Sequence, residues 1–307
     1  MAGQRGVAQL GRASGLGPEC RGFESRHPDR RVGVTTLRAM AVAPAHVRRV
    51  VAVDWSGALK RQKRKIWVAD LPIGSDTVRL TAGRTRDETV KRLIEIIDEA
   101  PHTVIGLDFA FSFPAWFLDH NCLEAAKDVW ERVGTSGESW LAECPWPFWG
   151  RADRTAPTKD APSLLRATEK LAGAPKSVFQ LNYPGAVGTS SLRGMPYLLK
   201  LRAAGCSIWP FDELRLPAVV EIYPRLYTGP VNKTSSTIRK QVAEALGVQG
   251  DNLLAATESD DAFDALLSVR EMKSRLEVDI TSAGAVVGEP AAREGWIWSV
   301  PPASGSP

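Results

Sequence analysis

The chain has 307 residues, of which 44% are hydrophobic and 24% charged. This balance is typical of globular proteins and excludes collagen-like and largely disordered chains. Its apolar runs stop well short of the roughly 18 residues that span a bilayer, so we expect no membrane partner. The net charge of +4 arises within residues 1–40, and the rest of the chain carries no net charge. Any electrostatic binding surface therefore has to be local.

Residues 1–40 are rich in glycine and arginine and show neither a helical nor a strand period. The peptides at 8–13 and 22–26 resemble the conceptual translation of the D-arm and T-arm of a transfer-RNA gene. We therefore expect this leader to be non-native, with translation starting at Met40; the alternative is a disordered basic tail.

The folded domain is expected over residues 47–300, followed by a disordered tail over residues 301–307. The four cysteines show no paired CxxC spacing and are too few for a disulfide-rich secreted fold. This cysteine usage favours a reducing, cytoplasmic location. The sequence leaves the oligomeric state open.

The first half of the domain alternates short apolar runs with turns. Runs of β-branched and apolar residues predict strands at 50–55, 66–71 and 77–81, joined as an antiparallel meander. Apolar residues at helical spacing predict a helix that starts near Asp87. Residues 103–108 then return as a strand, and a strand, helix, strand order predicts parallel pairing with a right-handed crossover.

The second half begins with a segment, residues 140–162, that is crowded with proline and aromatic side chains and predicts a loop. Beyond it we expect helices at 191–204, 238–246 and 260–272, and strands at 207–210 and 218–223. The predicted fold is therefore α/β, a mixed sheet of three antiparallel strands followed by parallel strands, with helices on both faces and loop insertions.

Carboxylates occur where packing alone would not place them. Asp54 and Asp108 each follow an apolar strand, Glu221 interrupts another strand, and Asp261 and Asp264 lie one helical turn apart in the predicted last helix. Burying several unpaired carboxylates is costly unless a cation compensates them. The carboxyl ends of parallel strands meet at one edge, so Asp54 and Asp108 should lie together there.

All-oxygen ligands without a His or Cys cluster select Mg²⁺ or Mn²⁺. Two such ions about 3.5 to 4 Å apart can activate water for phosphodiester cleavage. A single acid at a strand end is more often a turn or cap residue, and Asp260 suits that role as an N-cap or first-turn acid. For Asp54, Asp108, Asp261 and Asp264 taken together, the metal site is the favoured interpretation.

Four motifs carry a family resemblance. They are Asp-Trp-Ser-Gly at 54–57, Leu-Asp-Phe-Ala-Phe-Ser-Phe-Pro at 107–114, Glu-Ile-Tyr-Pro-Arg at 221–225 and Asp-Asp-Ala-Phe-Asp-Ala-Leu at 260–266. In this order they resemble a domain-of-unknown-function family described as predicted RNase H-like nucleases. The last motif is also similar to the Asp-Ala-x-Asp-Ala-Leu of RuvC-type Holliday-junction resolvases.

The resemblance covers about residues 50–272 and implies an RNase H-like fold. It maps Asp54, Asp108, Asp261 and Asp264 onto catalytic, metal-binding acids, and makes Glu221 an extra acid with a supporting or third-ligand role. It implies a nuclease that cleaves nucleic acid, DNA or RNA, with two Mg²⁺ or Mn²⁺ ions.

Three further segments are candidates for nucleic-acid binding. The basic turn offers Lys60, Arg61, Lys63, Arg64 and Lys65 for phosphate contacts. Trp146 and Trp149, with Arg151 nearby, suit stacking on unpaired bases. Glycines and hydroxyls before the helix at 191–204 suggest an anion cradle that includes Thr189, Ser190 and Arg193. The alternatives are a solvated hairpin tip, a hydrophobic lid and an ordinary capped helix.

Two rival functions remain from the sequence. A catalytically silent binding module for nucleic acid or protein would keep the basic turn and the Trp loop without metal chemistry. A phosphotransferase of the actin and sugar-kinase type would need a second phosphate motif and a duplicated domain, which a chain of this length does not offer.

Overall fold

The computed structural model describes residues 42–302, apart from 159–161, 174–175, 184, 230 and 287. The expected leader over residues 1–40 and the tail from residue 303 onward lie outside this described part. Within it, no helix combines the length and the apolar character needed to cross a membrane.

Six strands form a mixed sheet in the order β3-β2-β1-β4-β6-β5. They are β1 (Arg49–Asp54), β2 (Trp67–Pro72), β3 (Arg79–Thr81), β4 (Thr103–Leu107), β5 (Ser207–Ile208) and β6 (Ala218–Glu221). β1 and β2 pair antiparallel, as do β2 and β3, whereas β4 runs parallel to β1 and β6, and β5 runs parallel to β6. The predicted α/β class and the change from antiparallel to parallel strands are confirmed.

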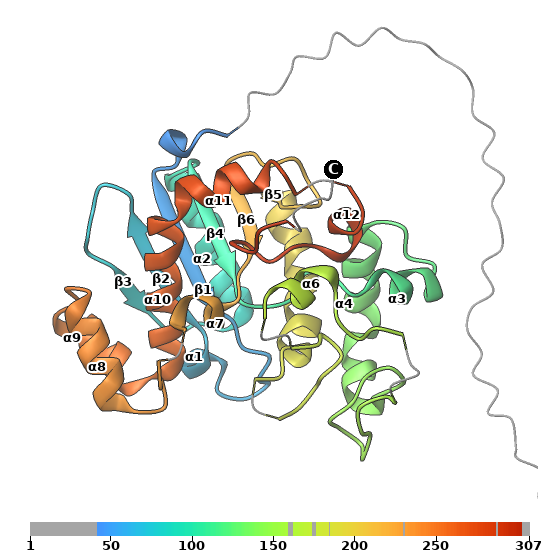
Figure 1. Ribbon diagram of the computed structural model, residues 1–307. Coiled ribbons are helices and arrows are strands. Elements are labelled where there is room, and N and C mark those ends of the chain that lie inside the picture. The colour runs from blue at the N-terminus through green and yellow to red at the C-terminus, as the bar shows by residue number, and fades with distance from the viewer. Residues whose placement is uncertain are drawn as a thin grey trace, which may run out of the picture.

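Helices cover both faces of the sheet (Figure 1). On one face lie α2 (Arg86–Glu99), α3 (Ala115–His120), α4 (Ala126–Glu143) and α6 (Gly188–Ala203). On the other lie α8 (Ser236–Ala245), α9 (Gly250–Glu258), α10 (Asp260–Ser274), α11 (Leu276–Ala283) and α12 (Ala291–Glu294). The connections contain η1 (Pro44–His46), α1 (Gln62–Lys65), α5 (Ala167–Leu171) and α7 (Pro224–Thr228).

The side chains of β1 alternate between two hydrophobic clusters, because successive residues of a strand point to opposite faces. Val51 and Val53 join the cluster formed with α2, α4 and α6, whereas Val50 and Ala52 join the cluster around α10. By the same alternation Asp54 lies on the α10 face. One helix, α10, therefore approaches the end of β1 that carries the first aspartate.

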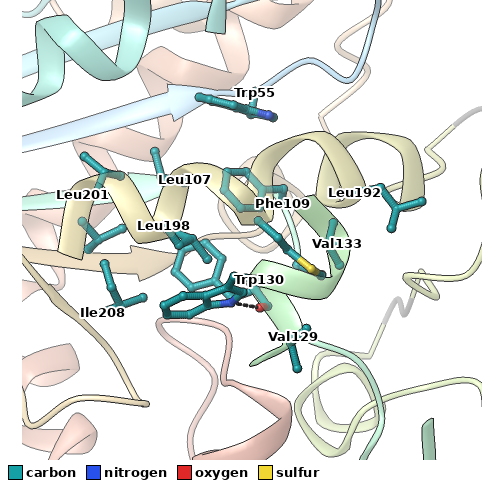
Figure 2. Packing of buried hydrophobic residues seen from close by; sticks show 14 of the residues in the cluster. Trp55, Leu107, Phe109, Val129, Trp130, Val133, Leu192, Leu198, Leu201 and Ile208 are labelled. Atoms are coloured by element: carbon teal, nitrogen blue, oxygen red, sulfur yellow. Dashed lines mark hydrogen bonds between the residues drawn. The ribbon is translucent and has the colours of Figure 1, made fainter. Parts of the chain in front are cut away.

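Figure 2 shows the cluster on the opposite face, where Trp55 lies beyond the end of β1. The Trp55 and Phe109 rings pack with centroids 5.3 Å apart. Trp130 of α4 donates a hydrogen bond of 2.8 Å from Nε1 to the carbonyl of Phe111. These contacts fix the chain that follows β4 against α4 and so help to position Asp108.

The middle of the chain departs from the prediction of a loop over residues 140–162. α4 continues to Glu143, and its buried stripe includes Val133 and Leu141. It ends at Cys144, which has a φ of 47° and precedes a proline that cannot continue a helix. The predicted loop is therefore wrong for its first residues, because the amphipathic pattern of α4 extends into them.

Candidate functional site

Asp54 and Asp108 lie next to each other at the carboxyl ends of β1 and β4. The last paired residues of the two strands are Val53 and Leu107, and the Asp108 N–H donates to the Val53 carbonyl over 3.1 Å. Asp54 is 8% exposed. Because the two residues follow a register pair of parallel strands, their side chains emerge on the same face. This juxtaposition is the one the sequence predicted.

α10 brings two more aspartates to this end of the sheet. It packs across β1 and β2 and begins after Ser259, whose side chain accepts a hydrogen bond from the N–H of Ala262. Asp264 is buried, whereas Asp261 is half-buried and pairs with Lys65 over 3.0 Å. Asp260 is exposed in the first turn, the place expected for an acid that the helix dipole stabilises.

The aspartates perturb one another. Burial raises the pKa of Asp54 well above its usual range, and the charges of Asp108, Asp261 and Asp264 raise it further. Burial raises the pKa of Asp108 to about 8, with Asp264 the largest charge that raises it. Burial also raises the pKa of both Asp261 and Asp264. Two of the four carboxylates, Asp54 and Asp264, are buried and two, Asp108 and Asp261, are half-buried. Because their charges raise one another's pKa, they form one electrostatic cluster, which we call the aspartate cluster.

Lys233 joins the aspartate cluster, and the sequence analysis missed it. Its ammonium contacts Oδ2 of Asp264. Burial alone would lower the pKa of Lys233, but the neighbouring Asp264 carboxylate raises it above the usual lysine value. Nothing in the spacing around residue 233 marks this lysine, since it reaches the cluster from the loop before α8.

One oxygen of Asp264 points to a ligand. Asp264 is only 5% exposed, and its Oδ1 is buried with no hydrogen-bond partner within the described part of the chain. An unpaired carboxylate oxygen in the interior costs free energy unless a donor or a cation meets it. This orphaned atom is the clearest sign that the aspartate cluster is built to bind something.

Glu221 lies on the opposite face of the sheet from the aspartates. Val220 and Ile222 join the α10 cluster, so the alternation of β6 turns Glu221 the other way. There it accepts hydrogen bonds from Arg166 at 2.5 and 2.8 Å and from the Phe111 N–H at 3.0 Å. Hydrogen-bond donors thus engage both carboxylate oxygens of Glu221. Of the two roles expected for this acid, a supporting one and that of a third metal ligand, the arrangement suits the supporting role.

Arg166 is itself a buried hub, 1% exposed, that the sequence did not single out. Besides Glu221 it bonds Oε1 of Glu169 over 3.0 Å and the Glu294 carbonyl over 3.1 Å. The nearby carboxylates keep its guanidinium charged by raising its pKa, against the effect of burial. This network ties β6 to the segment after β4 and to the chain near α12.

A cavity of about 540 Å³ opens beside the aspartate cluster. Asp108, Asp264 and Lys233 line it together with the buried Arg166 network, and Ser190 of α6 lines it from the other side of the sheet end. Apolar walls include Phe109 and Ile222. Its volume falls within the range of small-molecule sites.

The basic turn lies next to the aspartate cluster rather than at an isolated hairpin tip. Its residues Lys60, Arg61, Lys63, Arg64 and Lys65 are all exposed, and the turn contains the short helix α1. Four of these cations line a groove of about 440 Å³ whose opposite wall holds Asp260 and Asp261. Lys63 pairs with Glu88 over 3.1 Å. The groove places positive charge directly beside the first turn of α10.

The Trp loop and the proposed anion cradle are more dispersed. Trp146 is 52% exposed and packs on Trp116, with ring centroids 5.3 Å apart. It lines a separate groove of about 650 Å³ in which neither Trp149 nor Arg151 takes part. Arg151 instead donates to the Thr189 hydroxyl over 3.3 Å. The structure therefore leaves Trp146 as the most exposed aromatic of the loop.

Only part of the cradle faces the cavity. Ser190 lines it, whereas Thr189 uses its hydroxyl to donate to the Leu181 carbonyl over 2.7 Å. Arg193 is buried and forms two bonds to Glu138, at 2.7 and 2.8 Å, and one to the carbonyl of Gly57. Arg193 thus anchors α6 to the loop after β1 in place of meeting an anion.

The donor set suits a hard divalent cation in its chemistry. No three His, Cys, Asp or Glu side chains of the described residues are arranged to hold an ion together as they stand. Mg²⁺, however, is commonly held by one or two carboxylates and completed by water and substrate phosphate. Asp54 and Asp108, on neighbouring strands, and the unpaired oxygen of Asp264 supply carboxylate oxygens of the kind that such an ion takes as ligands.

Comparison of the chain with protein-family models, curated proteins and solved structures found no match. The family resemblance therefore stays a prediction.

Proposed function

We propose that the protein hydrolyses phosphodiester bonds of nucleic acid with the help of Mg²⁺ or Mn²⁺ bound at the aspartate cluster. The observation that carries the proposal is the placement of Asp54 and Asp108 on neighbouring parallel strands, facing a buried Asp264 whose Oδ1 has no partner among the described residues. Bound there, a divalent ion would polarise the phosphate and lower the pKa of an attacking water.

The four aspartates of the cluster have different roles in this proposal. Asp54, Asp108 and Asp264 hold the ion, and Asp261, which Lys65 partly neutralises, lies at the edge of the same cluster. Burial of these acids keeps bulk water away and strengthens their attraction for a cation. No histidine would be needed as a base in this scheme, because a divalent ion held by these acids would itself activate the attacking water.

The cavity and the cationic groove beside the aspartate cluster support nucleic acid as the substrate. The cationic groove of the basic turn can follow a phosphate backbone, while the cavity of about 540 Å³ accepts a single nucleotide unit next to Asp108 and Asp264. A cavity of this size favours a strand end or an unpaired nucleotide over the middle of a duplex.

The test is cleavage of end-labelled oligonucleotides, single-stranded and duplex, in the presence of Mg²⁺ or Mn²⁺. Wild-type protein should cleave, and Asp54→Asn should lower the rate by about 100-fold or more, since even the outer partners of metal sites cost roughly that much. Asp98→Asn is the matched control, because Asp98 is an exposed acid of α2 on the opposite face of the sheet. Equal loss in both variants would contradict the proposal.

A second candidate is a binding module without catalysis, and one observation favours it. Lys233 already neutralises Asp264, so the aspartate cluster holds a cation of its own. In that case the protein would bind oligonucleotides equally well with and without divalent ions, and Asp54→Asn would leave binding unchanged. The phosphotransferase alternative gains nothing from the fold, since the described strands form one sheet and not a duplicated pair.

A further inference from the structure

Lys233 and Asp264 form the closest ion pair of the aspartate cluster. Both side chains line the cavity together with Asp108. The Asp264 side chain is 8% exposed, whereas that of Lys233 is 36% exposed, so the ammonium covers a buried carboxylate from the solvent side. A positive charge of the chain itself thus occupies Oδ2 of Asp264 and leaves Oδ1 to an added cation.

The loop that carries Lys233 is fixed by buried contacts. Arg239 of α8, only 7% exposed, donates from Nη1 to the Lys233 carbonyl over 2.5 Å. The same guanidinium donates to the Thr257 carbonyl over 3.0 and 2.6 Å, close to the start of α10. One buried arginine therefore sets the position of the Lys233 backbone relative to the helix that carries Asp264.

The charges of the aspartate cluster bear on how many ions it takes. Fully ionised, its four aspartates carry four negative charges. Lys65 pairs with Asp261 and Lys233 pairs with Asp264. These two ammonium groups leave two negative charges, which a single divalent cation neutralises. A second divalent ion would give the buried site a net positive charge, at a high desolvation cost.

We propose that the Lys233 ammonium takes the place of one of the two divalent ions, so that the site binds a single Mg²⁺ or Mn²⁺ ion beside Asp54 and Asp108. The inference rests on the proposed function of the aspartate cluster. An ammonium carries three N–H donors, so its bond to Asp264 leaves donors for a phosphate oxygen in the cavity. Lys233 then supplies positive charge against the phosphate, as one ion does in two-ion sites.

The test is the stoichiometry of Mn²⁺ binding to the full chain, measured by calorimetry and by electron paramagnetic resonance. We expect the wild type to bind one Mn²⁺ and Lys233→Met to bind two, with the two ions magnetically coupled. Lys240→Met is the matched control, since Lys240 is an exposed lysine of α8 that pairs only loosely with Glu244, over 3.8 Å. It should bind one ion, as the wild type does.

The outcomes separate this inference from the proposed function. Two ions in the wild type, or one ion in both the wild type and Lys233→Met, would overturn the role of Lys233 and leave a metal site standing. No Mn²⁺ in either protein would overturn both. If Lys233→Met does not fold, the wild-type count still decides, and Lys233→Arg, which keeps the charge, should retain a single ion.

Discussion

Asp264 of α10 is held between two unlike environments: its Oδ2 contacts the ammonium of Lys233, and its Oδ1 is buried with no hydrogen-bond partner in the described chain. One half of the carboxylate is therefore satisfied by the protein and the other half is not. A buried oxygen left in this state favours any conformation or ligand that brings a cation to it.

The raised pKa of Asp108 predicts a dependence of stability on pH. The folded protein holds the proton of Asp108 up to a pH of about 8, whereas the unfolded chain releases it near the usual value of 3.8. The folded state then binds more protons than the unfolded state between these values, so the free energy of unfolding falls as pH rises from about 4 to about 8.

Removing this charge should reverse the effect. Asp108→Asn should be more stable than the wild type by about 1 to 2 kcal/mol at pH 8.5, and no more stable at pH 4. Urea unfolding at the two pH values, without divalent ions, measures the difference. A gain of equal size at both pH values would show that burial of the charge is not the cause.

The Arg166–Glu221 pair should be essential for stability. Glu221→Gln keeps the size of the side chain but leaves the Arg166 charge, which is 1% exposed, less fully compensated. Breaking a buried pair in this way typically costs about 3 to 5 kcal/mol, reduced here by the remaining Glu169. Thermal unfolding should show a clear loss, whereas Glu131→Gln, in an exposed pair with Lys127, should cost under about 1 kcal/mol. Similar losses in both variants would contradict the account.

The basic turn should govern the affinity for nucleic acid and its dependence on salt. Replacing Arg61 and Arg64 with glutamine removes two exposed cations that line the cationic groove. Each lost phosphate contact should lower the slope of log K against log salt by about 0.7 to 0.9. Fluorescence anisotropy with a labelled oligonucleotide at several salt concentrations measures this slope. The Lys240→Gln control should leave it unchanged, and an unchanged slope in the double variant would exclude the turn as a contact.

Gly57 should tolerate no side chain. A Cβ there would lie 2.5 Å from the Thr189 carbonyl carbon and 2.6 Å from the Ser190 nitrogen, in the backbone of α6. Because backbone cannot move aside as a flexible side chain can, Gly57→Ala should cost about 1 to 3 kcal/mol. Gly74→Ala, at a position where a Cβ meets nothing within 4 Å, is the control for the unfolding measurement. A cost below that of the control would contradict the close approach.

The strands that position the candidate site could be predicted from the sequence, because their apolar runs are short and end at turns or acids. Asp54 and Asp108 were placed correctly relative to each other, since parallel pairing follows from the strand, helix, strand order. The sequence analysis predicted no helix over α4, and the end of this helix lies in the segment from residue 140 that was predicted to be a loop. There, aromatic and proline content outweighed the helical period.

Other parts of the site depend on contacts that no local pattern reveals. Lys233 and Arg166 lie 31 and 55 residues in the sequence from Asp264 and Glu221, the acids with which they pair. Glu221 is a different case, because the alternation of Val220, Glu221 and Ile222 already implies that the glutamate points away from the face to which its apolar neighbours turn. The strand period therefore places Glu221 on the other face of the sheet, although it lines the same cavity as Asp108 and Asp264 and its charge raises the pKa of Asp108.

Binding of Mn²⁺ to the wild type and to an Asp54→Asn, Asp264→Asn double variant tests the central claim most directly. Calorimetric titration should show Mn²⁺ binding by the wild type and by the Asp98→Asn control, and at least a tenfold loss of affinity in the double variant, as removal of metal ligands requires. Equal affinity in all three proteins would contradict the claim that the aspartate cluster is a metal centre.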